Sequence, residues 1–114
     1  YNNGVKYCMD HIDECHLFIG THNEHTVQMS VLYMQEKGLA PNDERVWFSQ
    51  LYGMCDYLSF NLGAYEYNVA KYIPYGPVKA VIPYLVRRAD ENSSVAGQAA
   101  KELRLINKEL KRRV

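Results

Sequence analysis

The stretch RVWFSQL at residues 45–51 predicts a β-strand that ends near Gly53, and its surroundings decide the fold class. A helical pattern over residues 24–37 precedes it, with Gly38 as the stop residue. A short helix is expected over residues 54–62, stopped by Gly63. A strand between two helices is typical of a βαβ unit with parallel strands.

The same alternation extends along the rest of the chain. Strands are expected at residues 16–20, 45–51 and 69–74, and helices at 3–14, 24–37, 54–62, 77–92 and 96–113. Pro77 suits the first position of its helix, and Ser93 and Ser94 are expected to separate the last two helices. In the last helix the expected buried positions are Leu103, Leu105, Ile106 and Leu110. The order αβαβαβαα, without a hairpin signal, predicts a parallel sheet.

Three parallel strands are few for a complete domain, because a parallel sheet needs cover on both faces and leaves two edges bare. A (β/α)8 barrel needs about 250 residues, and this chain has 114. The simplest interpretation is a single partial domain, residues 1–114, forming the C-terminal portion of a TIM-type (β/α)8 barrel. The start at Tyr1, inside a helical pattern, agrees with a piece of something longer. The alternative is a complete three-stranded α/β domain.

Charge and cysteine content exclude several classes of protein. Thirteen basic residues balance thirteen acidic ones, so no overall field attracts nucleic acid or an anionic membrane. Three cysteines, Cys8, Cys15 and Cys55, are too few for a secreted disulfide framework and fit a reducing compartment. No apolar run approaches the ~20 residues of a membrane span, and no signal peptide is visible.

Metal binding is considered and not favoured. Cys8, His11 and Cys15 share one face of the first helix, but a helix face with buried cysteines explains them better than a zinc site. His22 and His25 lack a third ligand. Neither of the two Gly-rich phosphate-binding motifs, GxGxxG and Walker A, is present in the sequence.

Polar and aromatic residues cluster where the predicted strands end. In barrels the catalytic residues lie at the carboxyl ends of the strands. The three ends here read GTHN at 20–23, QLYGM at 50–54 and YIPYG at 72–76. The sequence therefore predicts a binding site at this edge of the sheet.

The helix over residues 77–92 carries two adjacent arginines, Arg87 and Arg88, with Tyr84 on the side of Arg88 and Glu91 three residues beyond it. Guanidinium groups match a carboxylate bidentately, so this group suits the carboxylate of a small amino-acid-like ligand. The alternative is a solvated helix face with an ion pair between Arg87 and Glu91. A helix that covers a barrel mouth would direct the arginines at the site.

Four blocks of sequence closely resemble the C-terminal part of proline dehydrogenase. They are THN at 21–23, QLYGMCD at 50–56, KYIPYGPV at 71–78, and PYLVRR at 83–88 continuing to ENSS at 91–94. The resemblance covers residues 16–114 and implies a distorted (β/α)8 barrel that holds FAD, oxidises L-proline to pyrroline-5-carboxylate and passes electrons to a quinone. It departs from the family in Ala64-Tyr65-Glu66-Tyr67, where relatives carry Gln-Ala-Gly-Tyr.

The resemblance also implies roles for individual residues. Arg87 and Arg88 would clamp the substrate carboxylate, and Tyr72, Tyr84 and Leu51 would line the proline pocket. Thr21 and His22 would contact the flavin. Glu91 would be an ionic partner near the same site. The family's lysine and aspartate at the substrate, and the arginine and lysine that hold the flavin, come from earlier strands, so no catalytic residue is assigned here and the piece alone is expected to be inactive.

Two other functions stay open at this point. One is hydroxyproline dehydrogenase, whose substrate carries one hydroxyl group more than proline. Tyr72 is the candidate residue for discriminating between the two substrates. A stand-alone, non-catalytic interaction domain would cover its bare sheet edges with a partner or by self-association. Relatives of the resembled family work at the mitochondrial inner membrane or on the cytoplasmic side of bacterial membranes, and the sequence favours neither.

Overall fold

The computed structural model describes residues 1–94 and 98–113 of the chain. Its elements follow the expected order: α1 (Asn2–Asp10), β1 (Leu17–Gly20), α2 (Glu24–Glu36), β2 (Val46–Leu51), α3 (Asp56–Ala64), β3 (Val69–Tyr72), α4 (Val78–Ser94) and α5 (Gln98–Arg113). They divide into two compact units, Tyr1–Ile73 and Pro74–Val114.

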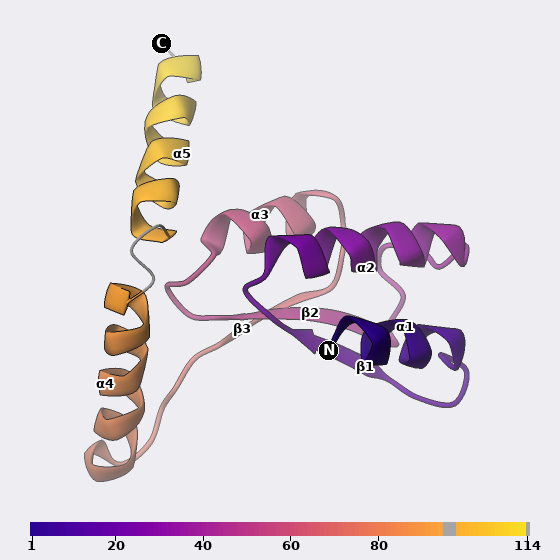
Figure 1. Ribbon diagram of the computed structural model, residues 1–114, viewed down its shortest axis with the longest axis horizontal. Coiled ribbons are helices and arrows are strands. Elements are labelled where there is room, and N and C mark those ends of the chain that lie inside the picture. The colour runs from indigo at the N-terminus through magenta and orange to yellow at the C-terminus, as the bar shows by residue number, and fades with distance from the viewer. Residues whose placement is uncertain (95–97, 114) are drawn as a thin grey trace. The chain divides into compact units, whose positions relative to one another are not determined.

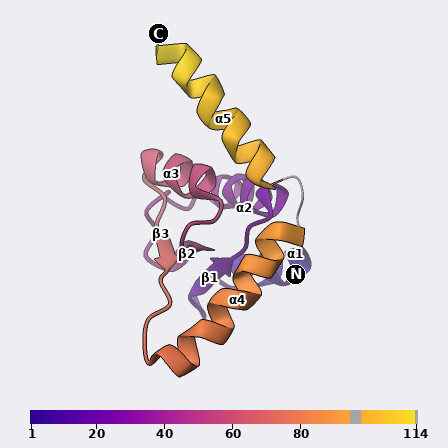
Figure 2. The ribbon, with the colours of Figure 1, turned by 90° about the vertical axis from the view of Figure 1, so that its left-hand side faces the viewer.

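The first unit contains one sheet of three parallel strands in the order β1-β2-β3. This confirms the predicted parallel α/β architecture. Helices α2 and α3 lie along one face of the sheet, and α1 packs beside α2 and β1 (Figures 1 and 2). The carboxyl ends of all three strands therefore meet at one edge.

The two faces of the sheet differ in cover because side chains alternate along a strand. In β2, Val46, Phe48 and Gln50 point to the helices and are all buried. On the other face, Trp47 is 39% exposed and Phe18, its register partner in β1, is 60% exposed. Helices thus cover only one face of this sheet within its own unit.

The core lies between the sheet and its helices. Phe48 is fully buried at its centre and meets the ring of Tyr67 edge to face, with ring centroids 5.9 Å apart. Other buried members come from every element of the unit except β3, among them Val5, Met9, Ile19, Val27, Met34, Val46, Leu58 and Leu62.

Helix ends account for most differences from the sequence-based expectation. Helix α1 ends at Asp10 and not at Glu14, because the backbone leaves the helical region at His11. Helix α3 begins only at Asp56, since Gly53 and Cys55 form a left-handed turn before it, and it runs through Gly63 to Ala64. The expected stop at Gly63 was wrong; the left-handed residue that follows the helix is Glu66.

The second unit consists of α4 and α5. The expected break at Ser93 and Ser94 was wrong, because α4 includes both residues. The expected start of the last helix at Ala96 lies outside the described residues, and α5 begins at Gln98. Three of the apolar positions predicted to be buried in α5 are largely exposed: Leu103, Ile106 and Leu110.

Asp43 and Arg45 form a two-pronged ion pair just before β2. Arg45 donates from Nε to Oδ1 over 2.9 Å and from an outer nitrogen to Oδ2 over 2.7 Å. The side chain of Asp43 is only 12% exposed. These bonds hold the pKa of Asp43 at about 2, below its ordinary 3.8.

The lowered pKa of Asp43 predicts a loss of stability in acid. A carboxyl group with a lower pKa in the folded state stabilises the fold above its unfolded pKa, and this stabilisation disappears as the pH falls toward 2. We expect Asp43→Asn to remove about 1–2 kcal/mol at neutral pH and to flatten the dependence of unfolding free energy on pH below 4. Denaturant unfolding across that pH range measures it. If the unfolding free energy of Asp43→Asn depended on pH as strongly as that of the unmodified protein, Asp43 would not be the group that causes the loss of stability.

Candidate active site

A depression of about 430 Å³ lies at the carboxyl edge of the sheet in the first unit. It is lined by Gly20, Thr21, His22, Ser49, Gln50 and Leu51. Three residues predicted for the site, Thr21, His22 and Leu51, therefore lie together. They come from the end of β1 and the end of β2, as the parallel arrangement requires.

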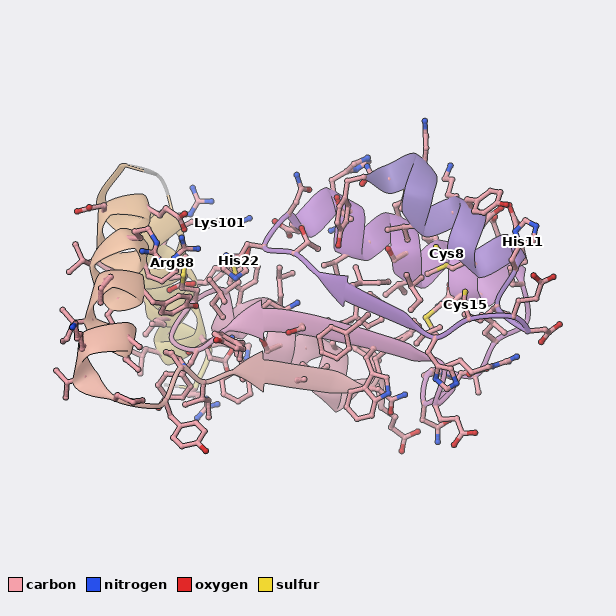
Figure 3. The ribbon with its side chains drawn as sticks, turned by 90° about the horizontal axis from the view of Figure 1, so that it is seen from below. Cys8, His11, Cys15, His22, Arg88 and Lys101 are labelled. Carbon is pink, nitrogen blue, oxygen red and sulfur yellow. The ribbon has the colours of Figure 1, made fainter. Side chains whose placement is uncertain are left out.

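His22 is fixed by the neighbouring strand. Its Nε2 accepts a hydrogen bond from the backbone N–H of Leu51 over 3.0 Å. A backbone N–H can only donate, so Nε2 carries no proton and the neutral ring bears its proton on Nδ1. His22 does not cap α2; the side chain of Asn23 does, accepting from Thr26 N over 3.1 Å. Figure 3 shows His22 just beyond the end of β1.

Gln50 links the same two strand ends from the helix side of the sheet. It is 2% exposed, its Nε2 donates to the carbonyl oxygen of Thr21 over 3.3 Å, and its Oε1 accepts from Ser59 Oγ over 2.7 Å. Sequence reasoning missed this role. The available signal was a polar residue on the face of the strand that otherwise carries Val46 and Phe48.

Tyr72 ends β3 opposite Leu51, its register partner in β2. Both side chains project from the face that lacks helices, and Tyr72 is 53% exposed. The carbonyl oxygen of Tyr72 accepts from Tyr52 N over 3.0 Å, so β2 and β3 stay paired to the last residue. Leu51 and Tyr72 thus form a neighbouring apolar and phenolic pair at the strand ends.

Helix α4 of the second unit carries the other predicted residues. Arg88 pairs with Glu91 over 2.7 Å, and its guanidinium carbon lies 5.3 Å from the ring centre of Tyr84. This contact has cation–π geometry. Figure 3 labels Arg88 on this helix. Glu91 therefore pairs at i+3 with Arg88, whereas the alternative drawn from the sequence paired it with Arg87.

The Arg88 side chain is 28% exposed, and its Nε is buried without a hydrogen-bond partner among the described residues. A buried guanidinium N–H without a partner is rare in folded proteins. Arg87 is exposed on the same helix. Arg88 thus keeps donor capacity on a side chain that Tyr84 and Glu91 already orient.

Within the described residues, the cysteines and histidines near the N-terminus form no group of three ligands that could hold a metal ion. Cys15 Sγ lies 3.5 Å from the carbonyl oxygens of Cys8 and His11. His11 Nδ1 contacts the carbonyl oxygen of Tyr7 over 2.9 Å. These side chains contact backbone carbonyl oxygens at the end of α1 and in the turn that follows it.

The fold and the residues at the strand ends place the chain among the parallel α/β proteins whose binding site lies at the carboxyl edge of the sheet. Residues 1–101 match the family model described as proline dehydrogenase, and the chain belongs to that family.

Curated relatives carry two names at similar identity. Proline dehydrogenase 1, mitochondrial, of Drosophila melanogaster is 46% identical over 96% of this chain and 16% of its own length. The Homo sapiens protein of the same name is 46% identical over the whole chain and 20% of its own length. Hydroxyproline dehydrogenase of Homo sapiens is 48% identical over the whole chain and 25% of its length.

The chain thus spans a quarter or less of each of these relatives. No solved structure gave a significant match. Among the residues that the structure describes, no helix has the length and apolar character needed to cross a membrane.

Proposed function

We propose that this chain is the C-terminal part of an FAD-dependent proline dehydrogenase, in which it supplies the last three βα units and the final helix of a distorted (β/α)8 barrel. Family membership supports the reaction class. The sheet supports the barrel position, because its helices cover one face and leave the other, with Phe18 and Trp47, for the interior.

The observation that carries the substrate proposal is the state of Arg88. Its guanidinium is held by Tyr84 and Glu91, and its buried Nε has no partner among the described residues. A substrate carboxylate would satisfy that N–H and accept from a second nitrogen of the planar fork. Arg87 would add a second positive charge on the same helix, so α4 would fix the orientation of an amino-acid carboxylate.

The pocket for the ring would be formed by apolar and phenolic side chains. Leu51 and Tyr72, register partners at the ends of β2 and β3, would contact it from the strand ends. These residues would orient the ring carbon next to nitrogen and exclude water from it. Loss of a hydride from that carbon and of the proton on nitrogen converts L-proline to pyrroline-5-carboxylate.

The residues at the strand ends fit a dinucleotide cofactor. Thr21 offers a hydroxyl group and His22 a ring whose proton lies on Nδ1, both lining the depression of about 430 Å³. Such donors suit the hydroxyl and phosphate oxygens of FAD. When bound, FAD supplies the hydride acceptor. The electrons would then pass to a quinone. A mitochondrial location would agree with the names of two relatives, which both include the word mitochondrial.

Hydroxyproline dehydrogenase is the second candidate, because relatives with that name are as similar as those named for proline. The substrates differ by one ring hydroxyl, so a residue beside the ring must discriminate between them. Tyr72 is our candidate, since its bulky phenol lies at a strand end next to Leu51.

We expect Tyr72→Ser in a full-length enzyme carrying this sequence to shift the ratio of kcat/KM for proline over hydroxyproline about tenfold toward hydroxyproline. The smaller side chain makes room for the extra hydroxyl group and offers it a hydrogen bond. Steady-state kinetics with both substrates measures the ratio. An unchanged ratio would exclude Tyr72 as the discriminating residue.

A further inference from the structure

Lys71, on the helix side of β3, has its ammonium group among three acceptors. Nζ lies 2.6 Å from the carbonyl oxygen of Met54, 3.4 Å from that of Leu51 and 2.7 Å from Asp56 Oδ1. An ammonium group has three N–H donors, so its capacity matches this set. The side chain is 22% exposed.

All three acceptors belong to the connection between β2 and α3. Leu51 ends β2, Met54 lies in the turn, and Asp56 begins α3. Lys71 therefore spans from the next strand to both ends of this turn. Its register partner is Gln50, one residue before the turn begins.

The turn needs support from outside its own backbone. Gly53 has φ of 74° and Cys55 has φ of 52°, both in the left-handed region. That region is unfavourable for a cysteine, which has a Cβ. Such a conformation persists when its surroundings hold it, and Lys71 binds the carbonyl of Met54, which lies between the two left-handed residues.

We propose that Lys71 is a positioning residue: it fixes the turn after β2 and thereby the placement of Leu51 and Tyr72 at the substrate pocket. The inference rests on the proposed function, because the pocket is the one assigned above. Leu51 is linked to Lys71 through its own carbonyl group. Tyr72 is the next residue along the chain, and its carbonyl group pairs with Tyr52 in the same turn.

A purely stabilising ion pair between Lys71 and Asp56 is the competing explanation. The carboxylate of Asp56 is 51% exposed, and exposed pairs contribute little because water screens them. The two explanations differ in what the carbonyl contacts do. If the ion pair alone matters, neutralising Asp56 must have the same effect as removing Lys71.

The test uses a full-length enzyme carrying this sequence, with L-proline as substrate. Lys71→Met is expected to raise the KM for proline about tenfold, a loss typical of a hydrogen bond to a charged group, with flavin content unchanged. Hydrogen–deuterium exchange in a peptide covering residues 51–56 should become faster. Asp56→Asn should change the KM less than about twofold.

Lys37→Met is the matched control, because it removes an exposed lysine paired with Asp10 in the same unit. It should leave the KM and the exchange of residues 51–56 unchanged. If Lys71→Met does not fold, Lys71→Arg replaces it as the test variant. It keeps the charge, but its planar fork cannot place donors on both carbonyls and the carboxylate, so we expect a rise in KM of about threefold.

An unchanged KM in Lys71→Met, or in Lys71→Arg if only that variant folds, overturns the inference. Equal effects of Asp56→Asn and Lys71→Met also overturn it, in favour of the ion pair. Failure of the proposed function has a different signature: the unmodified enzyme would then not oxidise proline at all.

Discussion

Arg88→Met in a full-length enzyme carrying this sequence is expected to raise the KM for L-proline about a hundredfold, with flavin content unchanged. Methionine keeps an unbranched stem of similar bulk but removes the planar fork that would bind the carboxylate. The buried Nε, which has no partner among the described residues, is the donor that the proposed substrate carboxylate would satisfy. Steady-state kinetics with proline and the flavin absorbance of the purified protein measure both quantities.

A matched control is Arg112→Met. Arg112 also pairs with a glutamate three residues away, Glu109 at 2.6 Å, but its side chain is 72% exposed. This variant should change neither the KM nor the flavin content. Loss of flavin from Arg88→Met with an unchanged KM would refute the carboxylate role of Arg88.

Phe48→Ala is expected to cost about 3–5 kcal/mol of unfolding free energy. Phe48 is fully buried at the centre of the first unit, where its ring meets Tyr67 edge to face. Truncation removes this contact and leaves a cavity beneath helices that cannot close over it completely. Denaturant unfolding of the purified chain, followed by circular dichroism, measures the difference.

Phe18→Ala provides the comparison, because Phe18 lies one strand away and is 60% exposed on the opposite face. Its loss should cost less than about 1 kcal/mol in the purified chain. Equal costs for the two substitutions would mean that the sheet face without helices is covered in solution, which would contradict the 60% exposure of Phe18.

The architecture was predictable because hydrophobic periodicity and strand order are local properties of the sequence. The alternation of helices and strands excluded a hairpin topology, and the sheet is parallel as expected. Helix ends were less predictable, since they depend on single backbone angles such as those of His11 and Cys55. The exposed apolar positions of α5 show a related limit: periodicity identifies the face that can be buried, and not what covers it.

Part of the candidate site was also predictable. Thr21, His22 and Leu51 follow or end strands, and parallel strands end at one edge. The contacts of Gln50 and Lys71 depend on side chains that reach from one strand or helix to another, and no spacing in the sequence encodes that reach. The partner of Glu91 was ambiguous for a similar reason, because i+3 and i+4 neighbours are both accessible on a helix.

We propose that this chain contributes the carboxylate-binding part of a flavin-dependent proline dehydrogenase. The decisive experiment mixes L-proline anaerobically with the full-length, FAD-containing enzyme and follows the flavin absorbance. We expect proline to bleach the flavin, and Arg88→Met to need a far higher proline concentration for the same bleaching. Flavin that neither proline nor hydroxyproline reduces, or equal concentration dependence in the two proteins, would contradict this proposal.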